Sequence, residues 1–295
     1  AGLLLGSRGI VEGIKYVDTL AEISDKAEMN KVLEAHKKNF KGSELVGKTL
    51  GVVGLGAIGS MVAEMALTLG MDVIGYDPAL SVEAAWRLSS QVRKADTLSA
   101  LFARCDYITL HLPVLDSTRG LVNAELFSAM REGTCLLNFA RQEIIDEAAL
   151  VEALNGERLR KYIADFPAPA LIGRDDVILM PHIGASTDEA EDNCAIMAAD
   201  QIRDFLENGN IRNSVNFPNL VLERVSGCRL SVTNENVPRI LGSVLSILAD
   251  ENINVIDMLN KSREEVAYNL IDIESHASED VLERMRALEG VINVR

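Results

Sequence analysis

The pattern that most constrains the fold is a short apolar run followed by three regularly spaced glycines. Residues 49–53 form the run, and the glycines follow in G-x-G-x-x-G spacing. This spacing predicts a strand, a tight turn and a helix: the first glycine permits the turn, the second lets a pyrophosphate approach, and the third lets the helix pack closely. Phosphates bind well at a helix N-terminus because its free N–H groups attract anions. The expected contacts are Gly54, Gly56, Ala57, Ile58 and Gly59.

An acidic residue after the next apolar run decides what these glycines bind. The glycines alone are also compatible with an ordinary turn that binds nothing. Residues 72–76 read as a second strand, and Asp77 ends it, about 20 residues after the glycines. A carboxylate in this position accepts hydrogen bonds from the adenosine ribose and repels a 2′-phosphate. The sequence therefore predicts a dinucleotide site, for NAD and not for NADP.

Charge and cysteine content exclude several classes of partner. A formal net charge of −15 argues against nucleic acid and anionic membranes as partners. No segment is long and apolar enough to span a bilayer. Cys105, Cys135, Cys194 and Cys228 lie far apart, and we interpret them as buried free thiols in a reducing compartment. With the four histidines also scattered, we expect no metal site and a cytoplasmic location.

Alternation of short apolar runs with helical stretches predicts the architecture of the first part. Buried parallel strands read as continuous β-branched runs, each followed by a crossover helix. We expect a doubly wound parallel sheet of about six strands, with ligands at the carboxyl ends of the strands. The expected strands are residues 49–53, 72–76, 107–110, 134–138, 162–164 and 177–180.

Four of these strand ends carry side chains suited to chemistry beside a nicotinamide ring. Arg141 offers a forked, permanently charged donor pair for the carboxylate and carbonyl of a 2-oxo acid. Histidine is the side chain suited to proton transfer near neutral pH, so His182 is the expected general acid/base. Asp165 could accept a hydrogen bond from the nicotinamide carboxamide, or act only as a turn residue. His111 could touch the cofactor or only cap its strand. Neighbouring cofactor contacts are expected at Pro113, Ala140, Gly184 and Ala185.

The C-terminal third predicts a different architecture. A helix over residues 188–208 is amphipathic, with Ile196, Ala199, Ile202, Phe205 and Leu206 expected to point inward. Beyond residue 224 the order is strand, helix, two strands, helix and strand, which is the βαββαβ pattern of a ferredoxin-like domain. We therefore expect an α/β protein in which a Rossmann sheet is followed by a separate small domain.

Taken together, these motifs resemble the D-isomer-specific 2-hydroxyacid dehydrogenases, and within them the members that oxidise 3-phosphoglycerate and carry a C-terminal ACT domain. The resemblance covers essentially the whole chain. It implies NAD as cofactor, a phosphorylated 2-hydroxy acid as substrate, the entry into serine synthesis as the pathway, and a homodimer or homotetramer. It divides the chain into an NAD-binding domain (1–188), a return helix and linker (189–222) and an ACT-like domain (228–295). The motifs are Gly-Leu-Gly-Ala-Ile-Gly, Tyr76-Asp77-Pro78, His111-Leu112-Pro113, Ala140-Arg141 and Pro181-His182-Ile183-Gly184-Ala185-Ser186-Thr187.

The chain departs from this family pattern in three places. Family members carry a substrate-domain segment ahead of the nucleotide domain, and the chain begins at the last helix of that segment, so we expect most of it to be absent. The family's glutamate partner of the catalytic histidine is missing after Asp165, and Gln142 stands where glycine is usual. In the tail, the family's histidine and glycine are replaced by Asn234 and Arg239.

The resemblance implies a regulatory amino acid for the tail. Asn236 and Asn254 match the effector-binding positions of the family. Because Asn234 and Arg239 depart from the pattern, serine regulation is left open. Two other functions also stay open: another 2-hydroxyacid dehydrogenase, such as a glyoxylate or hydroxypyruvate reductase, and a non-catalytic NAD-sensing protein.

Overall fold

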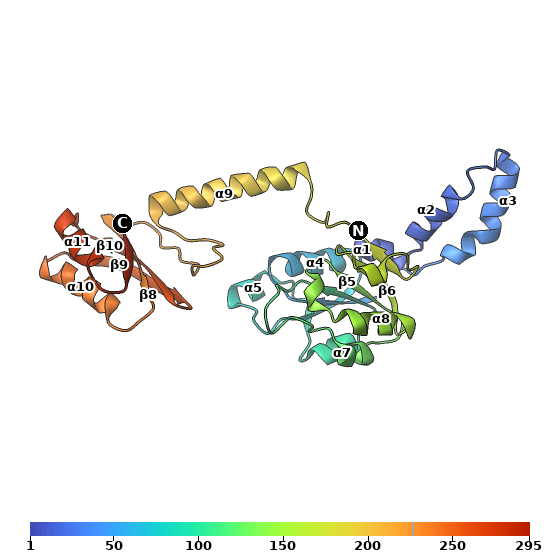
Figure 1. Ribbon diagram of the computed structural model, residues 1–295, viewed down its shortest axis with the longest axis horizontal. Helices are drawn as coiled ribbons and strands as arrows, with labels where there is room; N and C mark the ends of the chain where they lie inside the picture. The colour runs from blue at the N-terminus through green and yellow to red at the C-terminus, as the bar shows by residue number, and fades with distance from the viewer. Residues whose placement is uncertain (226) are drawn as a thin grey trace. The chain divides into compact units, whose positions relative to one another are not determined.

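The chain divides into two compact units, Ala1–Ala185 and Ser186–Arg295, each built around its own sheet (Figure 1). The structure is a computed structural model that describes residues 1–225 and 227–295, with the side chain of Glu83 left out. The predicted division into residues 1–188, 189–222 and 228–295 stays a prediction.

A parallel sheet of seven strands forms the centre of the first unit. Its strand order is β3-β2-β1-β4-β5-β6-β7, and every adjacent pair is parallel. The predicted doubly wound sheet is confirmed, with one strand more than expected: β3 is a two-residue, exposed, charged edge strand that apolar patterning does not reveal. The strands are β1 (Thr49–Val53), β2 (Asp72–Tyr76), β3 (Arg93–Lys94), β4 (Tyr107–Leu110), β5 (Thr134–Asn138), β6 (Leu159–Ala164) and β7 (Val177–Leu179).

Alternate residues of each central strand pack into two different cores, one on each face of the sheet. In β1, Leu50 and Val52 join the core that contains Val73 and Leu137, whereas Val53 joins the core that contains Phe102. Successive strand side chains point to opposite faces, so a strand covered on both sides must be apolar throughout. This explains why the parallel strands appear in the sequence as unbroken apolar runs.

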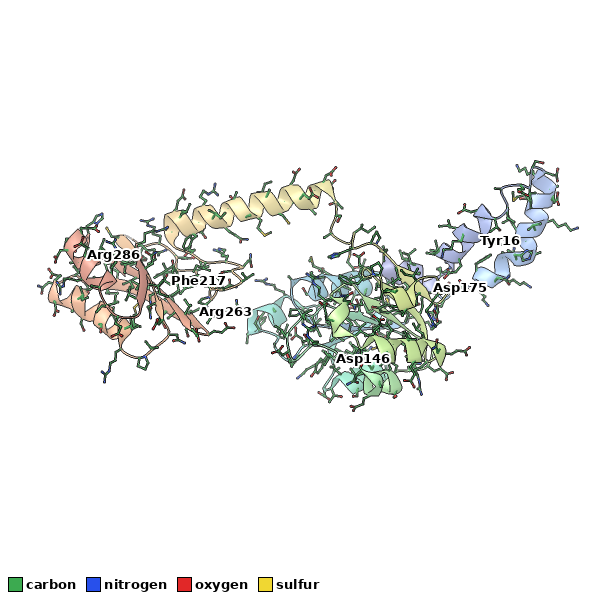
Figure 2. All side chains as sticks on the ribbon, viewed as in Figure 1. Tyr16, Asp146, Asp175, Phe217, Arg263 and Arg286 are labelled. Atoms are coloured by element: carbon green, nitrogen blue, oxygen red, sulfur yellow. The ribbon has the colours of Figure 1, made fainter. Side chains whose placement is uncertain are left out.

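Helices cover the sheet and extend beyond it at the N-terminal end. Tyr16, labelled in Figure 2, packs against His36 and Phe40, with ring centroids 5.3 and 5.2 Å apart, so aromatic contacts join α2 to the end of α3 and to the 3₁₀ segment after it. The helices are α1 (Gly2–Ser7), α2 (Ile10–Asp18), α3 (Lys26–His36), α4 (Ala57–Thr68), α5 (Val82–Arg87), α6 (Leu98–Phe102), α7 (Ala124–Ala129) and α8 (Glu147–Asn155). The short 3₁₀ segments are η1 (Lys37–Phe40), η2 (Gln142–Ile144) and η3 (Pro169–Leu171).

The second unit contains an antiparallel four-stranded sheet in the order β11-β8-β10-β9. Its elements follow one another as βαββαβ, as the sequence predicts. Figure 1 shows α10 and α11 together on one face of this sheet. The elements are α9 (Asp188–Asn208), β8 (Cys228–Glu235), α10 (Ile240–Asp250), β9 (Val255–Arg263), β10 (Val266–Ile273), α11 (Glu279–Arg286) and β11 (Val291–Val294).

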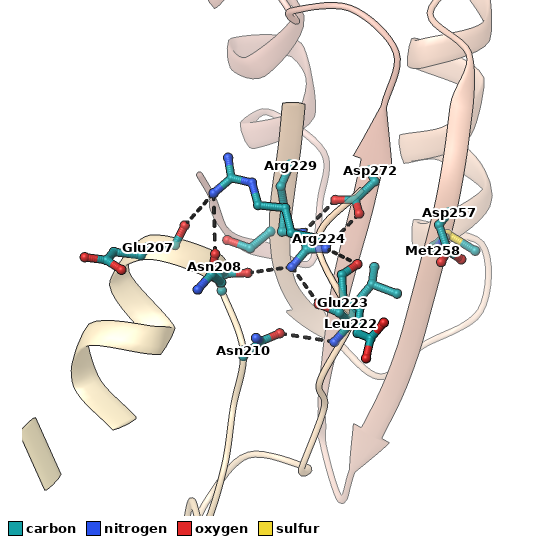
Figure 3. A network of polar contacts seen from close by, with 12 residues as sticks. Glu207, Asn208, Asn210, Leu222, Glu223, Arg224, Arg229, Asp257, Met258 and Asp272 are labelled. Carbon is teal, nitrogen blue, oxygen red and sulfur yellow. Dashed lines mark hydrogen bonds and ion pairs between the residues drawn. The ribbon is translucent and has the colours of Figure 1, made fainter. Parts of the chain in front are cut away.

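The two faces of the antiparallel sheet carry separate cores. One face packs against α10 and α11 through Ile271 and Ile273, and the other packs Tyr268 and Leu270 against the segment 211–222. A buried ion pair joins β8 to β10, and its guanidinium also binds backbone carbonyls near both ends of this segment (Figure 3). The guanidinium of Arg229 donates to both oxygens of Asp272, at 2.6 and 2.7 Å, and to the backbone carbonyls of Asn208, Leu222 and Glu223.

The packing expected for α9 is wrong. The helix buries none of its residues, and its supposedly inward side chains Ile196, Ile202 and Leu206 are exposed. The contacts found within its own unit are at its C-terminal end, where Arg295 donates to the carbonyls of Phe205 and Leu206. Neither α9 nor any other helix among the described residues is long and apolar enough to cross a membrane.

Two of the four cysteines differ from the prediction. Cys105 and Cys135 are buried free thiols, and burial raises the pKa of each to about 12. Cys228 is only half-buried, and Cys194 is exposed because it lies on α9. Burial of all four thiols was therefore wrong for these two positions.

Candidate active site

The glycine turn between β1 and α4 has the geometry that its sequence predicts. Gly54 adopts a φ of +88°, and a Cβ on it would lie 2.4 Å from the carbonyl oxygen of His111. A Cβ on Gly59 would lie 1.9 Å from the carbonyl oxygen of Gly54. A Cβ on Gly56 would meet nothing within 4 Å. The outer two positions thus require glycine for packing, while Gly56 borders open space at the N-terminus of α4, where a pyrophosphate fits.

Asp77 lies directly beside this turn. Its Oδ2 accepts a hydrogen bond from the backbone N–H of Leu55 at 2.8 Å, and its Oδ1 accepts one from Ala79 at 2.9 Å. The end of β2 and the glycine turn are therefore tied together through one carboxylate. Each carboxylate oxygen can accept more than one hydrogen bond, so this arrangement is compatible with an additional ribose hydroxyl.

His111 follows β4, and its backbone packs against the glycine turn. Its Nε2 shares a hydrogen bond with Oγ1 of Thr109 at 3.0 Å, and its backbone N–H donates to Val53 at 2.8 Å. Burial lowers the pKa of His111 to about 4, so the ring is neutral at physiological pH. These contacts favour a supporting role for His111 over a charged contact with the cofactor. Nearby, Oγ1 of Thr118 donates to the carbonyl of Pro113 at 2.6 Å.

Asn138, at the end of β5, shapes the loop that carries Arg141. It is fully buried at the end of β5. Its Nδ2 donates to the carbonyl of Arg141 at 2.9 Å, and its Oδ1 accepts from the N–H of Ala140 at 3.1 Å. Sequence reasoning missed this role, although an asparagine at the end of an apolar strand is a signal for such a turn. The Arg141 side chain is exposed, and one of its terminal nitrogens donates to Ala140.

The loop that carries His182 is held by Asp165. This carboxylate is only 3% exposed, and it accepts hydrogen bonds from the backbone N–H groups of Ile183 at 2.9 Å and Gly184 at 2.7 Å. His182 itself is exposed and has a φ of +57°, which is uncommon for a residue with a side chain. The contacts of Asp165 favour a role in holding this loop. The contact of Asp165 with nicotinamide stays a prediction.

The structure brings the predicted catalytic residues and the glycine turn to one edge of the sheet. β1, β4, β5, β6 and β7 are consecutive and parallel, so their carboxyl ends lie along the same edge. Arg141 follows β5, Asp165 follows β6, and His182 follows β7. An arginine that can hold a carboxylate and a histidine that can take a proton are thus available on the edge where a dinucleotide would bind.

The two predicted effector residues do not lie together within one copy of the chain. Asn236 donates its backbone N–H to Glu265, whereas the carbonyl of Asn254 accepts from Glu274. These two contacts are at opposite ends of β10, which pairs with β8 from Val266 to Ile273. Seven residue steps of about 3.3 Å separate the two ends by about 23 Å. A small effector therefore cannot contact both side chains of the same copy.

No group of three or more His, Cys, Asp or Glu side chains suited to a metal ion occurs in the described part of the chain. A hollow of about 490 Å³ lies between α2 and α3 and is lined by Tyr16, Leu33 and Phe40 among others. It contains none of the predicted site residues.

Comparison with known proteins identifies the nucleotide-binding part. Residues 14–184 match the model of the D-isomer specific 2-hydroxyacid dehydrogenase family, NAD binding domain. The chain is similar to D-3-phosphoglycerate dehydrogenase of Haemophilus influenzae, at 34% identity over 88% of this chain and 65% of that protein. It is also similar to D-3-phosphoglycerate dehydrogenase of Synechocystis sp., at 42% identity over 62% of this chain and 34% of that protein.

A solved structure supports the same assignment. NAD⁺-bound 3-phosphoglycerate dehydrogenase of Entamoeba histolytica matches with a TM-score of 0.53 and 35% identity, over 60% of this chain and 57% of that one. The chain thus spans between one third and two thirds of the length of these relatives. The prediction of NAD as the cofactor is confirmed by the matched domain. By its matched residues and its fold, the chain belongs to the D-isomer specific 2-hydroxyacid dehydrogenase family.

Proposed function

We propose that this protein catalyses the NAD-dependent oxidation of 3-phosphoglycerate to 3-phosphohydroxypyruvate. The observation that carries the proposal is the placement of Arg141 and His182 on the sheet edge that also holds the glycine turn. The named relatives, which are D-3-phosphoglycerate dehydrogenases, support the choice of substrate. The reaction would form the first step of L-serine synthesis.

Each residue has a separate task in this reaction. Arg141 orients the substrate by holding its carboxylate, and its charge favours the oxygen that becomes a carbonyl. His182 accepts the hydroxyl proton on an imidazole nitrogen and returns it in the reverse direction. NAD, which Gly54, Gly56 and Asp77 would hold along this edge, would supply the acceptor for the hydride that leaves the same carbon. Asn138 and Asp165 fix the backbone of the two loops that carry these side chains.

Regulation and assembly belong to the same proposal. The βαββαβ topology of residues 228–295 supports an ACT-like domain. Because Asn236 and Asn254 lie at opposite ends of its sheet, an amino-acid effector that uses both would contact two copies, which fits a homodimer or homotetramer. The buried free thiols Cys105 and Cys135 support a reducing, cytoplasmic location.

Cofactor selectivity is tested by thermal unfolding. We expect NADH to raise the Tm of the chain and NADPH to raise it hardly at all, because a ligand stabilises the folded state that binds it. In Asp77→Ala the carboxylate that opposes a 2′-phosphate is gone, so the difference between the two cofactors should shrink. Equal shifts of the wild type by both cofactors would contradict the role of Asp77.

Catalysis is tested with the complete gene product, 3-phosphoglycerate and NAD. His182→Ala should lower kcat roughly 100-fold or more, the range for loss of a general acid/base. Arg141→Lys should act mainly on substrate binding, because lysine lacks the planar fork. Turnover of glyoxylate or hydroxypyruvate in preference to the phosphorylated pair would identify another 2-hydroxyacid dehydrogenase. Binding of NADH without turnover of any of these would indicate an NAD-sensing protein.

A further inference from the structure

Among the described residues, no carboxylate is bonded to the imidazole of His182. Residues 166–173 follow β6 and contain no carboxylate. Asp165, the carboxylate bonded to this loop among the described residues, is used by the backbone of Ile183 and Gly184. An exposed imidazole without a partner samples several rotamers, which lowers the fraction that is oriented for proton transfer. A neighbouring side chain without a carboxylate is therefore the candidate for orienting the ring.

The aromatic ring of Phe166 packs against that imidazole ring. It is half-buried, and its ring centroid lies 4.9 Å from the centroid of His182, with the two planes tilted by 48°. This separation is within the 4.5–7 Å range of favourable aromatic pairs. A second pair in the same unit, Tyr16 with Phe40, has nearly the same geometry at 5.2 Å and 37°.

Two consecutive residues thus contact the His182 loop in different ways. Asp165 holds the backbone just after His182, and this stabilises the uncommon φ of +57°. Phe166 contacts the imidazole itself. We propose that Phe166 is the positioning residue that orients the His182 ring in place of the missing glutamate. This inference rests on the proposed acid/base role of His182.

The orientation is tested without substrate by NMR of the histidine rings. With ¹³C-labelled histidine, the chain gives four ring signals, and His182→Gln assigns the relevant one. We expect this signal to move and broaden in Phe166→Leu, because the ring current is lost and the imidazole samples several rotamers. Phe166→Tyr should retain the wild-type position and width. Phe40→Leu, which removes the matched pair with Tyr16, should leave the His182 signal unchanged.

Turnover by the complete gene product supplies the second measurement. Phe166→Leu should lower kcat roughly 2- to 12-fold, the equivalent of one aromatic pair, with KM unchanged, and Phe166→Tyr should restore it. A sharp, unmoved His182 signal in Phe166→Leu overturns the inference, and so does a rise in KM with kcat unchanged. If the signal changes as expected but neither wild type nor Phe166→Tyr oxidises any 2-hydroxy acid, the contact stands and the proposed function fails.

Discussion

Two strand-to-helix turns of this chain solve the same geometric problem with different residues. The turn from β1 to α4 places glycine where the backbone has positive φ, at Gly54. The turn from β8 to α10 places Arg239 at a φ of +82°, directly before the helix. Side chains make this left-handed region unfavourable by about 1–2 kcal/mol. The first turn is therefore relaxed, and the second is strained.

The surroundings of the two turns also differ, because the first borders open space and the second adjoins a buried polar side chain. At the first turn, Gly56 borders open space and Asp77 is held beside it. At the second, Asn234 is almost fully buried: it accepts a hydrogen bond from Asn269 at 2.7 Å and donates one to the carbonyl of Glu235 at 2.6 Å. Its polar atoms are thus used within the sheet. The first turn therefore retains the features of a ligand site. In the second, Asn234 stands where the resembled family has a histidine, and its side chain supports the fold.

Gly59→Ala should have the largest effect on the first turn. The new Cβ would lie 1.9 Å from the carbonyl oxygen of Gly54, so the strand and helix must move apart. We expect a loss of at least about 3 kcal/mol in the free energy of unfolding, together with loss of NADH binding. Urea unfolding of the chain, with and without NADH, measures both quantities.

Gly56→Ala provides the matched control for that variant. Its Cβ meets nothing within 4 Å, and φ is −66°, so the free energy of unfolding should change by less than about 1 kcal/mol. NADH binding should nevertheless weaken, because a methyl group would enter the space for the pyrophosphate. If Gly56→Ala binds NADH as the wild type does, the assignment of this turn to the cofactor is wrong.

Acid should weaken the first unit through His111, which lies against the glycine turn. Its pKa is lowered from 6.5 to about 4 by burial, so the unfolded chain binds a proton between these pH values and the folded chain does not. The contribution of the neutral His111 ring to the free energy of unfolding is therefore fully present above pH 6.5, and it is lost as the pH falls toward 4. Allowing for partial solvent access, we expect a loss of roughly 2 kcal/mol.

The variant His111→Gln isolates this contribution. Glutamine retains a polar group near Thr109 but does not titrate in this range. In urea titrations from pH 7 to 4.5, the transition that NADH shifts should therefore depend less on pH in His111→Gln than in the wild type. Identical pH dependence in the two proteins would show that His111 is not the buried neutral base that its contacts indicate.

Much of the fold could be predicted because the two units follow simple periodicities. Strands β1, β2, β4 and β5 begin and end at the predicted residues, since continuous apolar runs bounded by turns leave little ambiguity. The edge strand β3 was missed because two charged residues carry no such pattern. Helix α10 begins at Ile240 because the left-handed backbone of Arg239 interrupts any earlier start.

Predictions of packing and of side-chain partners were less successful. Periodicity correctly gave α9 an apolar side, but it could not show that no sheet of its own unit covers that side. The location of Arg141 and His182 could be predicted, because each follows the end of a predicted strand. The supporting contacts of Asn138, Asp165 and Phe166 arise between segments that lie far apart in the sequence or turn back on themselves. The Asn138 turn has a signature in the sequence, an asparagine at the end of an apolar strand, but the contacts of Asp165 and Phe166 have none.

The second turn should give the smallest effect, and one of opposite sign. Arg239→Gly removes the side chain from a residue whose φ is +82°. Glycine adopts this conformation without strain, although it also increases the entropy of the unfolded chain. The net result should be a gain of about 0.5–1 kcal/mol in the free energy of unfolding, measured by urea on the transition that NADH does not shift. Arg239→Ala retains the strain and should unfold like the wild type. A loss of stability in Arg239→Gly would mean that the Arg239 side chain makes a favourable contact in the assembled protein. The difference between the two turns would then reflect assembly and not backbone strain.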